Sequence, residues 1–240
     1  MLTRRNPLTY ILDTIYSIYF NFHYLPFWQA IHLPILFHKP TFVSLKGKVR
    51  IEGKVRRGMI RLGYFLHGGY PDGGFMFENN GGEIIFNNSV WVGGNSSFSI
   101  GPYGLLKISG PTGSVEGLKI ACYHYISIER ECRIGWDVMM MDTSFHLLKN
   151  TDGSFTGSGV SPIVIGHNSW ISTRCLVFPG AKIAPYTILA ANSTLNKEFL
   201  ESYVLLAGAP AQIKRRGIYR DMNDDQIDYA KHSILNQPPD

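Results

Sequence analysis

The stretch "IGHNSWISTRCLVFPGAKIAPYTILAANSTLNK", Ile165 to Lys197, repeats with a period of six residues. Every sixth residue is aliphatic, and the residue four positions later in each hexad is small. The aliphatic series is Ile165, Ile171, Val177, Ile183, Leu189 and Leu195, and the small series is Ser169, Cys175, Ala181, Thr187 and Ser193. An amphipathic helix would repeat at three- and four-residue steps, and a single strand would alternate with period two. A period of six predicts a β-solenoid in which each hexad is a short strand followed by a turn.

The same rhythm continues towards the N-terminus. It is clear at Cys122, Ile128, Ile134 and Met140 and at Ile126, Cys132 and Val138, and weaker at Leu45/Ile51, Val49/Val55 and Val92/Phe98. We therefore expect β-solenoid coils over residues 41–213, with aliphatic side chains inside and small ones at the bends. The periodicity leaves the hand of the coil open, although crossovers between parallel strands are normally right-handed.

Residues 1–40 form an aromatic leader. From Thr14 to His38 there is no Asp, Glu, Lys or Arg. A membrane-spanning helix needs roughly 20 consecutive apolar residues, and Pro26 and Pro34 interrupt this segment. Two interpretations stay open: a helix lying in a membrane interface, or a helix capping the core. At the other end, residues 214–240 form a tail in which Asn223 as N-cap predicts a short helix.

Composition sets the class of protein. Hydrophobic residues make up 45% and charged residues 17% of the chain, which suits a sizeable folded core. The three cysteines, Cys122, Cys132 and Cys175, match no CxxC pattern, and we expect reduced core residues. No secretory signal pattern is visible, so the expected location is the cytoplasm.

The net charge is +5, and part of the excess is local. Against Glu52 stand seven basic residues: Lys46, Lys48, Arg50, Lys54, Arg56, Arg57 and Arg61. The cluster indicates either a solvated strand face or attraction to an anionic surface such as phospholipid. No nucleic-acid-binding motif accompanies it, so a nucleic-acid partner is not expected.

Residues 141–162 separate the two regular runs and predict a loop extruded from the solenoid. Its first part, "MDTSFHLLKNT", contains Asp142, Ser144 and His146. Loops on rigid scaffolds often carry chemistry. Imidazole, with an ordinary pKa of about 6.5, suits a general base, and a nearby carboxylate can fix its tautomer.

The hexads, followed by "LLAGAPAQIKRR", resemble the hexapeptide-repeat acyltransferases over about residues 120–216. The most similar branch is the maltose/galactoside O-acetyltransferase-like one, which supplies acetyltransferases to capsule and O-antigen gene clusters. The resemblance rests on I-G-x-x-x-W-I, P-G-x-x-I, A-A-x-S and G-x-P-A in that order. It implies an all-β fold, a left-handed parallel β-helix, and a homotrimer with active sites between subunits. It also implies acetyl transfer from acetyl-CoA, without a metal, to a sugar or lipid-linked saccharide hydroxyl, less often to an amine.

The resemblance also assigns roles residue by residue. His146 matches the family's base, and Asp142 is the candidate carboxylate beside it, while Ser144 replaces the second acid of the usual D-x-D-x-H. The expected acetyl-CoA contacts are Trp170 at the acetyl and pantetheine site, Thr173 and Ala191 in the groove, and Asn196, Lys197 and Arg215 near the nucleotide.

Two other classes of protein remain as alternatives. Some trimeric β-helices are zinc carbonic anhydrases, for which His124, His146 and His167 would be the ligands. Those enzymes share a histidine pair five residues apart, which this sequence lacks. A non-catalytic β-helix that assembles or binds sugar is the other alternative, because a fold does not imply a function.

Overall fold

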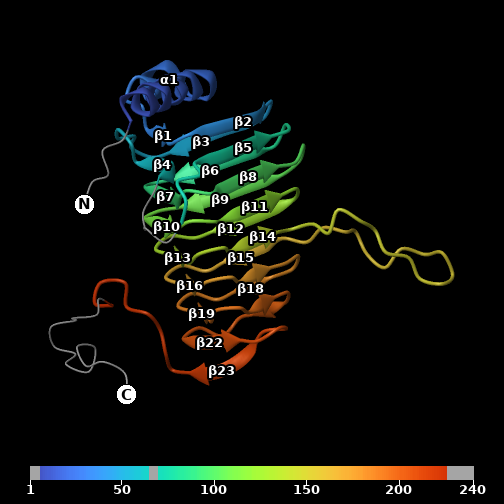
Figure 1. The fold of residues 1–240 in the computed structure, drawn as a ribbon. Coiled ribbons are helices and arrows are strands. Elements are labelled where there is room, and N and C mark those ends of the chain that lie inside the picture. The colour runs from blue at the N-terminus through green and yellow to red at the C-terminus, as the bar shows by residue number, and fades with distance from the viewer. Residues whose placement is uncertain (1–5, 65–69, 226–240) are drawn as a thin grey trace.

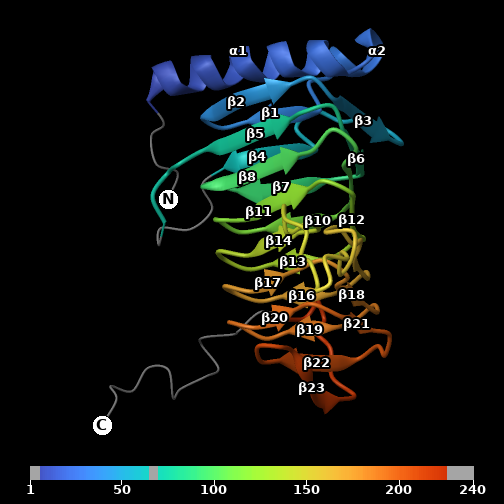
Figure 2. The same ribbon diagram turned by 90° about the vertical axis from the view of Figure 1, so that its right-hand side faces the viewer.

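The structure is a computed structural model that describes residues 6–64 and 70–225. The described strands form three sheets, A, B and C, which run side by side along one solenoid (Figure 1, Figure 2). Within each sheet consecutive coils pair in parallel, and only the last pair, β22 with β23, is antiparallel among the described strands. The parallel sheets and the six-residue repeat confirm the predicted parallel β-helix, and the architecture agrees with the predicted left-handed coil.

The chain visits sheets A, B and C in turn, so each coil contributes one strand to each. Sheet A contains β1 (Ile35–Phe37), β4 (Ile60–Tyr64), β7 (Val90–Gly93), β10 (Thr112–Ser114), β13 (Arg133–Ile134), β16 (Trp170–Ile171), β19 (Ile188–Leu189), β22 (Val204–Ala207) and β23 (Gln212–Arg216). Sheet B contains β2 (Pro40–Leu45), β5 (Phe75–Asn79), β8 (Ser96–Ile100), β11 (Lys119–Cys122), β14 (Met139–Met141), β17 (Leu176–Val177) and β20 (Thr194–Leu195). Sheet C contains β3 (Lys48–Glu52), β6 (Glu83–Asn87), β9 (Leu105–Ser109), β12 (Tyr125–Ile128), β15 (Ile163–Ile165), β18 (Lys182–Ile183) and β21 (Glu198–Phe199). We call the bends between successive sheets the A–B, B–C and C–A corners.

The hexads work as the sequence predicts. All six aliphatic residues and all five small residues of the two series are buried. The residue before each small one has a positive φ, namely Asn168, Arg174, Gly180, Tyr186 and Asn192. Each bend therefore uses a left-handed backbone residue, and the next side chain points into the crowded corner. Small polar side chains there bond to the bend itself, as when Thr187 Oγ1 donates to the Ala184 carbonyl at 2.7 Å.

The N-terminal coils are built differently. Their strands are mostly four to six residues long, against two in β16 to β21. Their interior is filled by phenylalanines, including Phe75, Phe77, Phe86 and Phe98, all fully buried. Larger side chains and longer bends break the strict period of six, which explains why the rhythm is weak before residue 120.

Helix α1 (Pro7–Tyr24) lies across the N-terminal end of the solenoid, followed by the short α2 (Phe27–Ala30) (Figure 2). Asn6 caps α1 by accepting the Leu8 backbone N–H at 3.0 Å. Phe20 packs against Phe37 and Phe77 of the first coils. The inner face of α1 therefore caps the core, as one of the two interpretations of the leader predicts. Strand β1 already belongs to sheet A, so the first coil begins inside the segment predicted as leader.

The remaining predicted features lie at the middle and at the C-terminal end. Residues 142–162 project from the solenoid between β14 and β15, as expected (Figure 1). The predicted terminal helix, with Ile227, Ala230 and Ile234, lies outside the described residues, although its N-cap Asn223 is within them. Across residues 6–64 and 70–225, no helix is both long enough and apolar enough to cross a bilayer.

Candidate active site

The extruded loop leaves the solenoid at the B–C corner. Antiparallel bridges Thr143–Val160 and Lys149–Phe155 hold its two arms together. Residues 144–158 are exposed. Several of them are large and apolar: Phe145, Leu147, Leu148 and Phe155. An exposed arm with this composition is typical of a segment that contacts another surface.

His146 lies near the base of this loop with a defined geometry. Its Nδ1 is 3.0 Å from the Ser144 carbonyl oxygen. A carbonyl only accepts, so Nδ1 carries a proton in this contact, and in the neutral imidazole Nε2 then keeps its lone pair. The Ser144 hydroxyl in turn donates to the His146 carbonyl at 2.8 Å, across Phe145 in the left-handed region. Ser144, which stands where the usual second acid would be, thus orients the His146 ring through its own backbone carbonyl.

Asp142 is fully buried and anchors the base of the loop. Its Oδ1 accepts the backbone N–H of Tyr123 and its Oδ2 that of His124, both at 2.8 Å. The Tyr123 ring also packs edge-on against Phe145, with ring centroids 4.8 Å apart. The hydrogen bonds of the Asp142 carboxylate therefore go to the preceding coil, and within one chain the structure does not bring it to His146.

The cysteines lie inside the solenoid and are free thiols. Burial raises the pKa of Cys132 to about 12 and raises the pKa of Cys175 above its usual value. Burial and then the Asp142 carboxylate raise the pKa of Cys122 still further. All three are thus neutral near pH 7, and none has the exposed, thiolate character of a nucleophile.

A groove of about 510 Å³ lies on the outer face of sheet A and at the A–B corner. Its floor follows one line of paired residues across four coils, namely Trp91, Gly113, Arg133 and Trp170. A Cβ added at Gly113 would meet only the Trp91 carbonyl oxygen, at 4.0 Å, so the glycine keeps the middle of the groove low.

Three tryptophans line this groove, together with Thr173. Trp170 lies under Arg220 of the tail, whose guanidinium carbon is 4.7 Å from the ring centroid. Trp136 donates through Nε1 to the buried Glu116 carboxylate at 3.0 Å, which fixes the indole ring. The structure therefore unites Trp170 with Thr173 in one rigid, mostly apolar cleft.

The other predicted acetyl-CoA contacts lie elsewhere on the surface. Ala191 is exposed at the same A–B corner, one coil beyond Thr173, whose carbonyl accepts the Asn192 N–H at 3.0 Å. Asn196 and Lys197 are exposed at the B–C corner, and Arg215 is exposed on β23 of sheet A. The predicted site residues of one chain therefore form two separate groups. One group lies on sheet A and at the A–B corner, and the other lies at the B–C corner, from which the loop with His146 also projects.

Sequence reasoning missed several groove residues, notably Trp91, Trp136 and Arg220. Their positions depend on coil lengths that the irregular N-terminal repeats hide, and on the path of the tail. Arg133 could have been predicted, because Ile134 and Ile171 each hold the aliphatic position of a hexad in their own run, and stacking those two positions places Arg133 beside Trp170 in the next coil.

The histidines of the zinc alternative occupy different parts of the solenoid. His124 lies at the B–C corner, His146 in the loop and His167 at the C–A corner. Among the residues that the structure describes, no group of three or more His, Cys, Asp or Glu side chains is placed to hold a metal ion.

No protein-family model matches the sequence. A curated relative is an uncharacterized 24.8 kDa protein in the cps region of Klebsiella pneumoniae, 28% identical over 146 residues. That alignment covers 59% of this chain and 62% of the relative, so it leaves more than a third of the relative unmatched.

Three solved structures show weak similarity. The polySia-specific acetyltransferase NeuO is 15% identical, with 78% of this chain and 91% of that one covered and a TM-score of 0.49. The polysialic acid O-acetyltransferase OatWY is 15% identical, with 83% and 85% covered and a TM-score of 0.37. A variant of AntD, an N-acyltransferase from Bacillus cereus in complex with dTDP-4-amino-4,6-dideoxyglucose and Coenzyme A, is 14% identical, with 85% and 88% covered and a TM-score of 0.38. Each value lies below the range in which a structural likeness identifies an activity.

Proposed function

We propose that this protein is an acetyl-CoA-dependent O-acetyltransferase that acts on a hydroxyl of a sugar or polysaccharide precursor. The observation that carries the proposal is the pair of half-sites. One half is His146 on an exposed loop, with its Nε2 lone pair available. The other is the rigid cleft around Trp170, within the segment whose motifs resemble the hexapeptide-repeat acyltransferases.

In the proposed reaction His146 Nε2 takes the proton of the acceptor hydroxyl as its oxygen attacks the thioester carbonyl carbon. The tetrahedral intermediate then expels the CoA thiolate by breaking the C–S bond, and the imidazolium returns the proton to sulfur. The Ser144 carbonyl stabilises the His146 imidazolium by accepting a hydrogen bond from Nδ1–H. No covalent enzyme intermediate is needed, because the thiolate is already a good leaving group.

The donor is acetyl-CoA. We place its acetyl and pantetheine part against Trp170 and along Thr173 and Ala191, where an apolar wall and exposed backbone suit an extended chain. Its phosphates and nucleotide lie towards Asn196, Lys197 and Arg215, whose two cations attract phosphate. No metal takes part in this mechanism.

The active form is a homotrimer. Within one chain the loop and the cleft lie on different parts of the solenoid, so a neighbouring subunit brings His146 to Trp170. The exposed side chains Phe145, Leu147 and Leu148 support this assignment, because burial against a neighbour removes their apolar surface from water.

The acceptor class rests on the resemblance and on the relative in a cps region, a context that we extend to this chain. A sugar amine is the alternative acceptor, and a non-catalytic sugar-binding β-helix is the alternative function. We place the protein in the cytoplasm, at the inner face of the membrane, where the three buried thiols stay reduced.

The test is thiol release from acetyl-CoA with a panel of saccharides, combined with a calorimetric titration of CoA. We expect acceptor-dependent release and CoA binding. Mild alkali separates the acceptors, since it cleaves an O-acetyl ester and leaves an N-acetyl amide intact. Absence of CoA binding would favour the non-catalytic alternative, and stoichiometric zinc in the purified protein would favour the metalloenzyme.

A further inference from the structure

Beside the buried Phe20, the inner face of α1 carries a row of polar side chains. Ser17 Oγ accepts the Phe37 backbone N–H at 3.0 Å. Asn21 exchanges two hydrogen bonds with the backbone of Ile35, accepting its N–H at 3.1 Å and donating to its carbonyl at 2.7 Å. Both side chains are buried. The helix therefore pairs with the open edge of β1 as a neighbouring strand would, which protects that edge from pairing with another chain.

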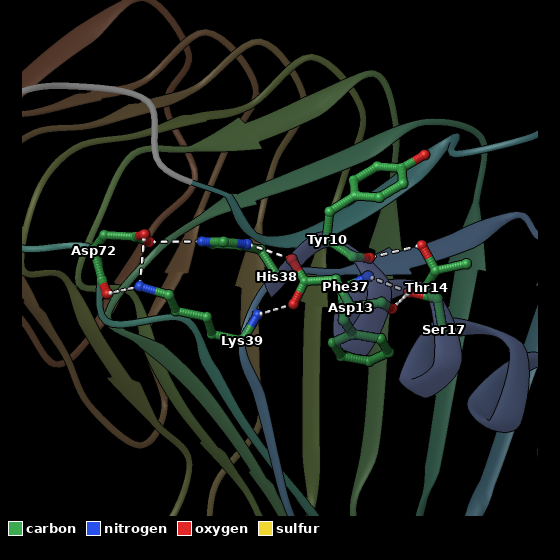
Figure 3. Close-up of polar contacts among 8 residues, drawn as sticks. All are labelled: Tyr10, Asp13, Thr14, Ser17, Phe37, His38, Lys39 and Asp72. Carbon is green, nitrogen blue, oxygen red and sulfur yellow. Dashed lines mark hydrogen bonds and ion pairs between the residues drawn. The ribbon is translucent and has the colours of Figure 1, made fainter. Parts of the chain in front are cut away.

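The spacing explains why a helix can do this. Four helical residues rise about 6 Å, and two strand residues span about 6.7 Å. Side chains at every fourth position of α1 thus match every second residue of the strand edge. Asp13 continues the row, since its Oδ1 accepts the Lys39 N–H at 2.7 Å. Figure 3 shows the part of this row formed by Asp13 and Ser17.

A buried histidine extends the attachment. His38 Nδ1 is 2.5 Å from Asp13 Oδ2, and its Nε2 is 2.8 Å from Asp72 Oδ1 (Figure 3). Lys39 Nζ is 2.8 Å from the other Asp72 oxygen. Each ring nitrogen of His38 therefore lies within hydrogen-bond distance of a carboxylate oxygen. The polar side of α1 is therefore held down by a continuous network, and the helix cannot roll to bury its other side.

The outer face of the two helices is apolar. Its exposed large side chains are Leu8, Ile11, Leu12, Ile15, Tyr16, Ile18, Tyr19, Phe22, Phe27, Trp28 and Ile31. We call this set the aromatic face. The most exposed members are Phe27 at 72%, and Trp28 and Leu8 at 61% each. In residues 6–38 the one Asp, Glu, Lys or Arg is the buried Asp13. A surface helix normally has the opposite arrangement, with its apolar side on the core.

Exposed basic residues border the aromatic face. Lys46, Lys48 and Arg50 line a cavity of about 590 Å³ together with His23 and Gln29 of the helices. On the other flank Arg57 lines a small cavity with Tyr10 and Thr14. The Arg50 side chain forms an ion pair with Glu83, whereas no such pair is present for Lys46, Lys48 or Arg57 among the described residues. The rim of the face therefore carries net positive charge.

We propose that the aromatic face binds the surface of an anionic phospholipid bilayer, with α1 and α2 lying in the plane of the interface. Aromatic and aliphatic side chains enter the boundary between headgroups and acyl chains, and the basic rim meets lipid phosphates. A second copy of this chain is a poorer occupant, because a symmetric end-to-end contact would bring two basic rims together. The inference does not depend on the proposed chemistry.

The geometry fixes how the solenoid stands on the membrane. Because α1 lies across the N-terminal end (Figure 2), the coils point away from the bilayer. In the homotrimer proposed above, three parallel solenoids would present three aromatic faces on one side, so that the attachment becomes multivalent.

The experiment is co-sedimentation of the full chain with vesicles of phosphatidylglycerol and phosphatidylcholine, compared with pure phosphatidylcholine. We expect binding to the anionic vesicles, partial release at high salt, and quenching of Trp28 fluorescence by brominated acyl chains. Trp28→Phe should abolish that quenching without abolishing binding, because the other three tryptophans lie on the solenoid.

Two double variants test the two components of the face. Phe27→Ser with Trp28→Ser should weaken binding by more than tenfold, whereas the matched control Tyr103→Ser with Leu200→Ser, 90% and 67% exposed elsewhere, should not. Lys46→Gln with Lys48→Gln should weaken binding to anionic vesicles roughly 30-fold. The control Lys182→Gln with Lys214→Gln, on the distant coils, should leave it unchanged.

The outcomes that overturn the proposal are distinct. Wild-type protein that stays in the supernatant with both vesicle types removes the bilayer as occupant. If the wild type does not bind vesicles and the Phe27→Ser with Trp28→Ser variant shows a smaller molecular mass by light scattering, the aromatic face would instead contact another copy of the chain. Equal binding to neutral and anionic vesicles would remove the role of the basic rim.

Discussion

The A–B and B–C corners of the solenoid follow the same hexads but build different surfaces. At the A–B corner Thr173 borders a cleft whose floor on sheet A includes Trp170, with Trp136 fixed by a buried carboxylate. At the B–C corner the chain leaves the coil for residues 142–162 and exposes His146 (Figure 1). One corner borders a preformed apolar surface, and the other is an arm that carries the proposed base. In the proposed mechanism, a single chain therefore keeps apart the base and the donor site that the reaction must combine.

The largest expected effect concerns the arm. We expect His146→Ala to lower kcat by about 10²–10⁴-fold, because the acceptor hydroxyl loses its general base. CoA should still bind, since the cleft lies at the other corner. The matched control is His124→Ala, an exposed histidine of the same corner, which should keep most activity. A His146→Ala enzyme with near-normal turnover would remove the residue from the mechanism.

The second prediction tests whether the corners meet between subunits. Thr173→Trp should fill the cleft and abolish turnover, as His146→Ala does. In trimers assembled from equal amounts of both variants, about a quarter of the interfaces would combine an intact loop with an intact cleft. Activity near one quarter of wild type should therefore return on co-expression. Mixed trimers that stay inactive would place both residues of each site in one subunit.

The third prediction concerns the anchor of the arm. Asp142→Asn replaces a carboxylate that accepts two buried N–H groups, so we expect a loss of about 1.5–3 kcal/mol in the free energy of unfolding. Turnover per folded molecule should change little. Asp152→Asn is the matched control, because Asp152 is exposed in the same loop. An unchanged melting temperature with a large fall in kcat would instead support the predicted catalytic role of Asp142.

The two corners also differ in how far the sequence could predict them. The hexads from Ile165 to Leu195 predicted the coils correctly, because a period of six is a local rule in which each bend needs a small side chain. The extruded loop was equally visible as a break in that rule. The partners of Asp142 were not visible, since Tyr123 and His124 belong to the preceding coil and only coil stacking brings them close.

The groove and the leader show the same limit. The line from Trp91 to Trp170 requires the lengths of coils whose bends follow no fixed period. In the leader the aromatic density was evident from the sequence. The pairing of Ser17 and Asn21 with β1 was not, because it depends on a helix lying along a strand edge. The sequence therefore left the capping and membrane interpretations open, and the structure shows that one face of the helix caps the coil.

The smallest effects concern the nucleotide end of the donor. Lys197 lies at the B–C corner and Arg215 on sheet A, so in the proposed trimer one CoA would meet them from two different subunits. Both are exposed, and an exposed charge contributes only about 0.2–1 kcal/mol. We therefore expect Lys197→Ala and Arg215→Ala each to raise KM for acetyl-CoA by about 1.5–5-fold with kcat unchanged. Lys119→Ala, at an exposed position on sheet B, is the control and should leave KM as it is.

Dephospho-CoA sharpens this last prediction. If Lys197 or Arg215 contacts the 3′-phosphate, its alanine variant should match wild type in KM for acetyl-dephospho-CoA, because the donor no longer carries the charge that the side chain attracts. The difference between variant and wild type should also shrink at about 1 M salt, where the Debye length falls to about 3 Å. A variant that raises KM equally for both donors, and does so at high salt, would act through packing at its own corner rather than through phosphate. That outcome would leave the cleft around Trp170 as the main determinant of donor binding.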